Sequence, residues 1–438
     1  MDKNIYTTKK IFRFWLPLAA TWLMMSLEGP YLAAIIARTA LPKFNLAAFG
    51  VAFSFALIVE APIIMIMSAS TALVNNRHDY FTLRNYTFLL NLVITVFMLV
   101  GLIPGVFYFI AEGMIGLPHN VAKLTHIASV IFLPWPAAIG FRRFYQGLLI
   151  KNGLTKLVAY GTIIRLIFMS ITALILFRMK VSGAYIGAAA LSTGVLAEAA
   201  FSRITVIGTI KKILGKTEKK GEKKVLTFKN INKFYFPLAL TTILALGVHP
   251  MVTFFMGKSR FPIESLAVLP VVNSLIFVFR SLGLSYQEVM IALLGMNRKN
   301  YEGIRKFAIY LGIFIIATLS LILFTPLLHI WFEKVSGLSF ELVKFSILPA
   351  RILVILPLLT LLISFQRALL VHTTETGPIK GASLIEIIMI LFTLYLTVFQ
   401  FGLPGAVAAA LSYTIGRLFA NSYLLPSQLN AIDSLKRK

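Results

Sequence analysis

Charged side chains inside long apolar stretches are the most informative residues of this sequence. Glu60 and Arg280 each lie near the middle of such a stretch, and Arg351 lies in another, between Pro349 and Pro357. A charge in the hydrocarbon of a bilayer is costly, so it must face protein, water or a partner, and by default it marks a functional site. The guanidinium group of arginine binds carboxylate and phosphate through two parallel hydrogen bonds. These arginines therefore indicate a site for an anion.

Arg142, Arg143 and Arg367 lie nearer to the ends of apolar stretches, where a long side chain can also reach the membrane surface. Anchoring of a helix end is therefore the alternative to substrate binding for all three. Because neighbouring residues on a helix point about 100° apart, only one of Arg142 and Arg143 can point squarely into a cavity. The candidate substrate-binding residues are Arg280, Arg351, Glu60, Arg143 and Arg367.

Two further titratable residues stand beside prolines, Glu28 before Pro30 and His249 before Pro250. Proline inside a helix frees a carbonyl group, a usual device where a transport helix bends around a cavity. Glu28, Glu60 and His249 are therefore candidates for gating or for coupling transport to H+ or Na+. A glutamate held by hydroxyl groups and a structural histidine are the alternatives. Six further residues are candidates for buried charges, and several of them are expected to pair with each other: Glu198, Glu288, Glu386, Arg165, Arg203 and Arg417.

The sequence lacks the motifs of common enzymes. It has no HExxH zinc motif, no Walker-type phosphate loop and no GxSxG nucleophile motif. Its six histidines have no metal-ligand spacing, and it has no cysteine. We therefore expect no enzymatic activity, no catalytic residue, no metal and no cofactor. Without a nucleotide-binding domain, transport would use an ion gradient or be passive.

The composition indicates an all-α polytopic membrane protein. Of 438 residues, 58% are hydrophobic and only 13% are charged, which is too apolar for a soluble domain of this length. The net charge of +26 does not predict a nucleic-acid partner, because most lysines and arginines lie in short loops at helix ends. Twelve apolar segments approach or exceed the roughly 20 residues needed to span a bilayer: 11–37, 46–74, 86–111, 121–150, 157–177, 183–210, 234–256, 263–294, 304–331, 342–371, 379–401 and 405–425.

A basic segment at 211–233 divides the twelve segments into two sets of six. It contains nine lysines and only two acidic residues, and such a loop stays in the cytoplasm. With this orientation the inner loops carry well over twice the positive charge of the outer ones. Both termini are therefore expected in the cytoplasm, with the protein in a plasma or inner membrane. The expected organisation is an N-lobe at 1–210, this linker, a C-lobe at 234–425 and a cytoplasmic tail at 426–438.

The two lobes show an internal repeat. The run FWLPLA at 14–19 aligns with FYFPLA at 234–239, and FRR at 141–143 aligns with FQR at 365–367. Each half has an even number of segments, so both halves enter the membrane with the same orientation and are expected to be related by an axis along the membrane normal. When the alignment of 14–19 with 234–239 is extended along the chain, Glu60 in the first half corresponds to Arg280 in the second.

The two six-helix halves resemble the multidrug/oligosaccharidyl-lipid/polysaccharide (MOP) superfamily, which includes the MATE exporters and lipid-linked-sugar flippases. The resemblance covers nearly the whole chain and includes RFYQG at 143–147 and NGLTK at 152–156. Within the superfamily, the runs FYFPLAL at 234–240 and LPARI at 348–352, with Pro357 and Arg367, are similar to the progressive ankylosis protein family. The long acidic C-terminal tail of that family's animal members is missing.

The resemblance implies a MATE-like secondary transporter working by alternating access, with a central cleft across which Glu60 and Arg280 would approach one another. The progressive ankylosis likeness implies export of small polyvalent anions such as citrate, pyrophosphate or nucleotides. A lipid-linked headgroup flippase and an H+- or Na+-coupled cationic multidrug antiporter are the alternatives. The expected partners are the anionic substrate, a coupling ion and membrane lipid, and the expected state is a monomer.

Cysteines introduced by Thr217→Cys and Lys436→Cys should both react only with reagents applied to the cytoplasmic side, because both lie in positively charged cytoplasmic segments. Labelling with a membrane-impermeant maleimide, in intact cells and in inverted vesicles, measures this. Reaction of either cysteine in intact cells would overturn the orientation and the even number of spans in each half.

Overall fold

The computed structural model describes residues 7–215, 226–296, 301–372 and 377–437. These residues are helical and contain no strand, apart from an isolated bridge between Arg260 and Pro404. Eleven helices of this part are long and apolar enough to cross a membrane. The twelfth is α19 (Gly405–Arg437), of 33 residues, whose polar residues include Arg417 and Asn421. The expected twelve-helix membrane architecture is thereby confirmed. Residues 216–225 of the basic linker lie outside the described residues.

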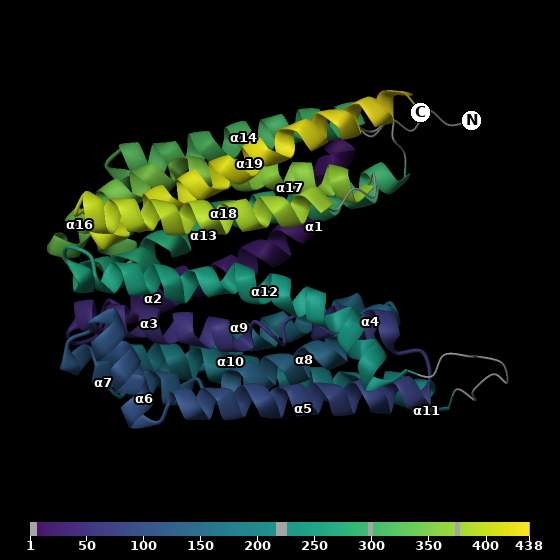
Figure 1. Cartoon of the computed structure of the whole chain (residues 1–438), viewed down its shortest axis with the longest axis horizontal. Coiled ribbons are helices and arrows are strands. Elements are labelled where there is room, and N and C mark those ends of the chain that lie inside the picture. The colour runs from purple at the N-terminus through teal and green to yellow at the C-terminus, as the bar shows by residue number, and fades with distance from the viewer. Residues whose placement is uncertain (1–6, 216–225, 297–300, 373–376, 438) are drawn as a thin grey trace. The chain divides into compact units, whose positions relative to one another are not determined.

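The chain divides into two compact units, which we call the first unit (Met1–Arg38 and Phe255–Lys438) and the second unit (Thr39–Phe254). The second unit contains α3 (Pro42–Glu60), α4 (Ile66–Leu73), α5 (Arg77–Gly101), α6 (Pro104–Tyr108), η1 (Phe109–Ile115), α7 (His119–Ile131), α8 (Pro134–Lys151), α9 (Thr155–Arg178), α10 (Gly183–Thr205), α11 (Ile207–Leu214) and most of α12 (Phe228–Gly257). Its helices α5, α8, α9 and α10 run side by side (Figure 1).

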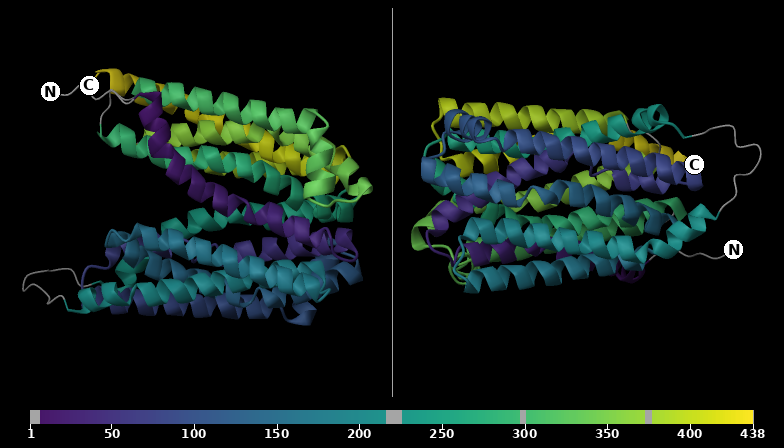
Figure 2. Two further views of the ribbon diagram at one scale, coloured as in Figure 1. Left: turned by 180° about the vertical axis from the view of Figure 1, so that it is seen from behind. Right: turned by 90° about the horizontal axis from the view of Figure 1, so that it is seen from below.

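The first unit contains α1 (Thr8–Ser26), α2 (Glu28–Ile36), α13 (Pro262–Met296), α14 (Tyr301–Phe324), α15 (Leu327–His329), η3 (Ile330–Val335), α16 (Phe340–Ile352), η4 (Leu353–Ile355), α17 (Leu356–His372), α18 (Gly377–Tyr395), η5 (Leu396–Gln400) and α19. Here α13 packs along α17, and α18 packs along α19 (Figures 1 and 2).

The units differ from the expected lobes because the first helix of each half packs with the other half. In the first unit, the Trp15 indole Nε1 of α1 donates a hydrogen bond to Ser285 Oγ of α13 at 2.8 Å, and the Trp15 ring packs against Phe307 of α14. In the second unit, the Tyr235 hydroxyl of α12 donates to the Pro62 carbonyl. Burial of these large side chains decides which unit α1 and α12 join.

Prolines and left-handed residues set the helix ends, and they do so in the same way in both halves. Leu41 and Phe261 have φ of 51° and 56°, and each precedes a proline that begins a helix, where the missing N–H has no intrahelical role. The left-handed residues Gly116 and Gly337, and Lys180 and Gly402, also occur at matching positions. A side chain adopts φ > 0 only at a cost, so these matches in local geometry support the internal repeat.

Helices α4 and α8 approach closely at Gly147. A Cβ atom added there would lie 2.5 Å from the Met67 carbonyl oxygen and 2.7 Å from Ser70 Cβ. The Ser70 hydroxyl donates to the Phe144 carbonyl at 2.7 Å, so the two helices are also tied by a hydrogen bond. Only glycine fits between them.

Gly147→Ala should therefore destabilise the protein by about 1–3 kcal/mol, the usual cost of overpacking a filled interior. Thermal unfolding of the purified protein in detergent measures the change. Gly208→Ala is the control, because a Cβ atom there would meet nothing within 4 Å and alanine favours the helix. Equal unfolding temperatures for the two variants would contradict the close approach.

Candidate functional site

The structure brings many of the charged side chains of the membrane-spanning helices into two clusters, one in each unit. The second-unit cluster comprises Glu60, Arg142, Arg143, Gln146, Arg165 and Glu198. The first-unit cluster comprises Arg280, Thr360, Arg367, Ser383, Glu386, Tyr413 and Arg417. The predicted site residues Glu60 and Arg143 belong to one cluster, and Arg280 and Arg367 belong to the other.

Glu198 of α10 is the acceptor at the centre of the second-unit cluster. Arg142 donates to its Oε2 atom, and Gln146 donates to Oε1 at 2.9 Å. Arg142 and Gln146 are four residues apart on α8, so both face α10. The Nε atom of Arg165 on α9 lies 3.6 Å from Oε2. Glu198 is 1% exposed and Arg142 is 6% exposed, so Arg142 is a buried ion-pair partner and does not anchor a helix end at the surface.

Glu60, the last residue of α3, is buried in the same cluster. Its Oε2 atom has no hydrogen-bond partner among the described residues, and the charges of Arg143, Arg142 and Arg165 act on it. Arg143 has only part of its surface exposed, and its buried Nε atom also makes no hydrogen bond within the described part of the chain. Glu60 and Arg143 therefore belong to the same buried cluster without forming a close ion pair among the described residues.

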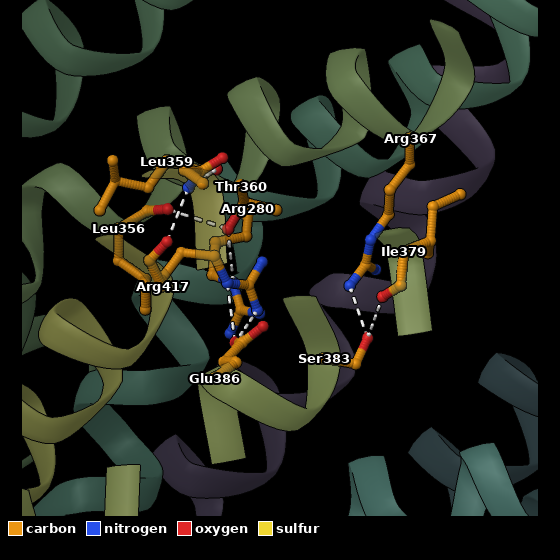
Figure 3. Close-up of polar contacts among 10 residues, drawn as sticks. Arg280, Leu356, Leu359, Thr360, Arg367, Ile379, Ser383, Glu386 and Arg417 are labelled. Carbon is orange, nitrogen blue, oxygen red and sulfur yellow. Dashed lines mark hydrogen bonds and ion pairs between the residues drawn. The ribbon is translucent and has the colours of Figure 1, made fainter. Parts of the chain in front are cut away.

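The first-unit cluster joins four helices (Figure 3). Arg417 of α19 donates to Glu386 Oε1 of α18 from Nε at 2.8 Å and from Nη2 at 2.7 Å. Arg280 of α13 donates from Nε to the Thr360 hydroxyl of α17 at 3.2 Å. Arg367 of α17 donates from Nη2 to the Ser383 hydroxyl of α18 at 3.2 Å. Two of the three guanidinium groups therefore contact a neutral acceptor.

In each half an ion pair joins the last two membrane helices, but the helix that carries the arginine differs between the halves. In the second unit the arginine is on α9 and the glutamate on α10, as Arg165 and Glu198. In the first unit the glutamate is on α18 and the arginine on α19, as Glu386 and Arg417. The expectation that these four residues pair with each other is confirmed. Arg203, in contrast, is exposed and lies over the Tyr145 ring, and the side chain of Glu288 lies outside the described residues.

Arg351 lies apart from both clusters. It is exposed, its Nε atom donates to the Leu323 carbonyl at 3.3 Å, and its guanidinium group lies 5.3 Å from the centre of the Phe324 ring. Leu323 and Phe324 end α14, so Arg351 is level with a helix end. Although Arg351 lies within an apolar run of the sequence, the structure does not place it near the other arginines.

Glu28 and His249 also lie outside the clusters. Glu28 is the first residue of α2, directly after the break that ends α1, so the expected bend is present there. His249 is partly buried in α12, which continues as one helix through Pro250, and its carbonyl accepts a hydrogen bond from the Thr253 hydroxyl at 3.0 Å. Both residues make further contacts. Their coupling role stays a prediction, as does the approach of Glu60 to Arg280.

Thr360, Ser383 and Tyr413 are the members of the clusters that sequence reasoning did not single out, and Gln146 entered it only as part of the run RFYQG at 143–147. Hydroxyl and amide side chains are common in membrane helices, and only their proximity to charged groups distinguishes these residues. Among the described residues, no group of three or more His, Cys, Asp or Glu side chains is arranged to hold a metal ion.

Comparison with solved structures shows the fold of the MOP superfamily. An inward-facing multidrug resistance MATE family transporter of that superfamily aligns with a TM-score of 0.74 at 15% identity, covering 96% of this chain and 99% of that chain. The lipid II flippase MurJ in an inward closed conformation gives 0.69 at 16% identity, covering 96% and 91%. A MOP superfamily transporter from Pyrococcus furiosus gives 0.52 at 14% identity, covering 98% and 94%. No family model and no curated protein matches the chain.

Glu198→Gln should destabilise the protein by about 3–5 kcal/mol, because it leaves Arg142 buried without its counter-charge. Thermal unfolding in detergent measures this, with Glu302→Gln as the control, since Glu302 is an exposed glutamate in the first turn of α14. If the two variants unfold at the same temperature, Glu198 does not hold the second-unit cluster together.

Proposed function

We propose that the protein is a secondary transporter of small polyvalent anions, of the citrate, pyrophosphate or nucleotide class, working by alternating access. The observation that carries the proposal is the charge of the first-unit cluster. Arg280, Arg367 and Arg417 stand there with one carboxylate, that of Glu386. An excess of guanidinium groups within membrane helices suits carboxylate or phosphate ligands and opposes cations.

Two comparisons support the proposal. The aligned structures are of transporters and a flippase, so this fold is used for moving solutes across membranes. The Pyrococcus furiosus transporter is described as having a binding pocket of reverse polarity, suggesting a different function. A change of pocket charge is therefore known on this fold. The sequence likeness to the progressive ankylosis family supplies the substrate class, with Arg280 as the main ligand and Arg143, Arg351 and Arg367 as further candidates.

Glu60 is the best placed of the candidate coupling residues. Its carboxylate is buried and has one oxygen without a hydrogen-bond donor among the described residues, so it can take up a proton without losing a hydrogen bond at that oxygen. Glu28 and His249 are kept as further candidates for H+ or Na+ coupling or gating. The proposal includes cytoplasmic termini, a plasma or inner membrane and a monomer, as the loop charges and the resemblance suggest.

A headgroup flippase is the second candidate, because the MurJ structure aligns over 96% of this chain. A flippase for an anionic headgroup would use the same arginines, but it would also act on a lipid-linked substrate. A cationic antiporter would instead depend on Glu28 and Glu60, and the surplus of arginine opposes it.

Arg280→Lys should weaken anion transport, and Arg280→Ala should nearly abolish it. Lysine keeps the charge but loses the bidentate fork, whereas alanine removes both. Flux of labelled citrate and pyrophosphate in proteoliposomes measures this, with a cationic dye and a short-chain lipid-linked diphosphate as competing substrates. Transport of the dye without either anion would refute the proposal and move the site to Glu28 and Glu60, and transport of the lipid-linked substrate alone would favour the flippase.

A further inference from the structure

The membrane span that carries Glu60 is interrupted directly after that residue. In the second unit α3 ends at Glu60 and α4 begins at Ile66, with turns between them. The corresponding stretch of the other half is one continuous helix, α13, which runs through Arg280. Breaks inside a membrane span are tolerated where they are buried in protein or line a cavity. Of the two halves, the one with the glutamate therefore has a break at this position.

The turns after Glu60 pack against the face of α8 that carries Arg143. The Ile63 N–H donates to the Glu60 carbonyl at 2.9 Å, and a Cβ atom added at Gly140 of α8 would lie 2.4 Å from Ile63 Cγ1. Gly140 and Arg143 are three residues apart on α8 and therefore share a face of that helix. Of the charges that act on Glu60, that of Arg143 is the strongest. The two side chains are therefore neighbours.

The titratable and charged groups around Glu60 and Arg143 come from four helices: Arg142 of α8, Arg165 of α9, Glu198 of α10 and Tyr235 of α12. Arg142 donates to Glu198, Arg165 lies 3.6 Å from the same carboxylate, and the Tyr235 hydroxyl donates to the Pro62 carbonyl. Helices α5 and α7 also pack against α3, and among the described residues they contribute no charge that acts on Glu60.

Glu60 and Arg143 each have unused hydrogen-bonding capacity. Glu60 is 6% exposed, and its Oε2 atom has no donor among the described residues. The Arg143 guanidinium group makes no hydrogen bond and no ion pair within 4 Å in the described part of the chain. Because Arg143 is partly exposed, a ligand can reach it. An unsatisfied buried polar group costs free energy, so a ligand that accepts from Arg143 would remove that cost.

We infer that Arg143 binds one oxyanion group, carboxylate or phosphate, and that this binding requires Glu60 to be protonated. The reason is charge balance in a site of low dielectric constant. When Glu60 is ionised, its carboxylate neutralises Arg143 and repels an incoming anion. When Glu60 is protonated, Arg143 has no counter-charge, and a pair of anionic oxygens suits its guanidinium group. The anion and the proton therefore occupy the site together.

The ion pair of the first-unit cluster does not have this property. Glu386 accepts from Nε and Nη2 of Arg417 at 2.8 and 2.7 Å (Figure 3). Protonation of Glu386 would break that ion pair, whereas Glu60 has no close ion pair to lose among the described residues. The proton-linked anion site is therefore assigned to the second unit. Its role in transport rests on the proposed function, but binding at the site does not.

Isothermal titration calorimetry of the purified full-length protein in detergent tests the site. The probes are acetate and sulfate, which stay fully ionised between about pH 6 and pH 9, so any pH dependence comes from the protein. At least one probe should bind saturably at the acidic end of this range. Its affinity should fall as the pH rises, by up to about ten-fold per pH unit, because ionisation of Glu60 removes the binding-competent form. In Glu60→Gln the affinity should not change with pH.

The same titrations count the protons that bind with the anion. The heat of binding, measured in two buffers of different ionisation enthalpy, gives the number of protons taken up. Where Glu60 is ionised before the anion binds, the wild type should take up about one proton per anion, and Glu60→Gln should take up none. Equal proton uptake in the two proteins would show that Glu60 is not the group that titrates.

Arg143→Gln should weaken binding of the probe about ten-fold or more, as expected for loss of hydrogen bonds to a charged group. Arg178→Gln is the matched control, because it removes one positive charge from an exposed position at the end of α9 in the same unit. It should leave both the affinity and its pH dependence unchanged. Absence of saturable binding in the wild type, an equal loss in Arg178→Gln, or an unchanged pH dependence in Glu60→Gln would each overturn the assignment.

Thermal unfolding checks that the variants are folded and provides a second readout. The bound anion should raise the unfolding temperature of the wild type more at low pH than at high pH, and it should raise that of Glu60→Gln equally at both. It should leave the unfolding temperature of Arg143→Gln unchanged. Stabilisation of Arg143→Gln to the wild-type extent would place the anion elsewhere.

The two proposals fail separately. If the anion binds as described but no anion crosses proteoliposome membranes, the site stands and the transport function is lost. If anions are transported while Arg143→Gln leaves binding unchanged and Glu60→Gln leaves its pH dependence unchanged, the transport function stands and this site is wrong.

Discussion

The cost of burying a charge in a membrane protein is the constraint that organises both units. Helices satisfy their own backbone hydrogen bonds in hydrocarbon, but arginine and glutamate side chains need partners. Glu198 receives donors from α8 and lies beside an arginine of α9, so one carboxylate holds three helices in register. The pair of Glu386 and Arg417 does the same for α18 and α19. These contacts place the polar groups that a solute could meet.

The two halves share backbone geometry and differ in side-chain chemistry. Left-handed residues before α3 and α13 have nearly the same φ, 51° at Leu41 and 56° at Phe261, because each chain segment must turn sharply into a helix that begins with proline. The ion pairs of the last two helices are reversed between the halves. Either direction neutralises both partners equally well, so reversal is tolerated. What differs is which charged residues surround each pair.

The proposed function would divide the roles between the two units. The first unit has arginines whose donors are only partly used, a property suited to holding an anion. The second unit has a buried glutamate near several arginines, a property suited to taking up a proton when the surrounding positive charge changes. Breaks at proline-containing segments, such as the one between α1 and α2, supply positions where helices can bend. Binding, coupling and movement would then depend on separate sets of residues within one fold.

The sequence by itself determined the membrane class, the twelve spans, the internal repeat and some of the charges that pair, such as Glu386 and Arg417. Hydrophobicity, loop charge and proline positions are local properties, so a linear chain displays them. Only the tertiary structure decided that Arg142 is a buried partner of Glu198, that Arg351 lies level with the end of α14, and that α1 and α12 join the other half. It also revealed Thr360 and Ser383. The side of a helix that faces protein depends on how that helix is rotated about its axis relative to its neighbours. This rotation cannot be inferred from the residue spacing along one apolar segment.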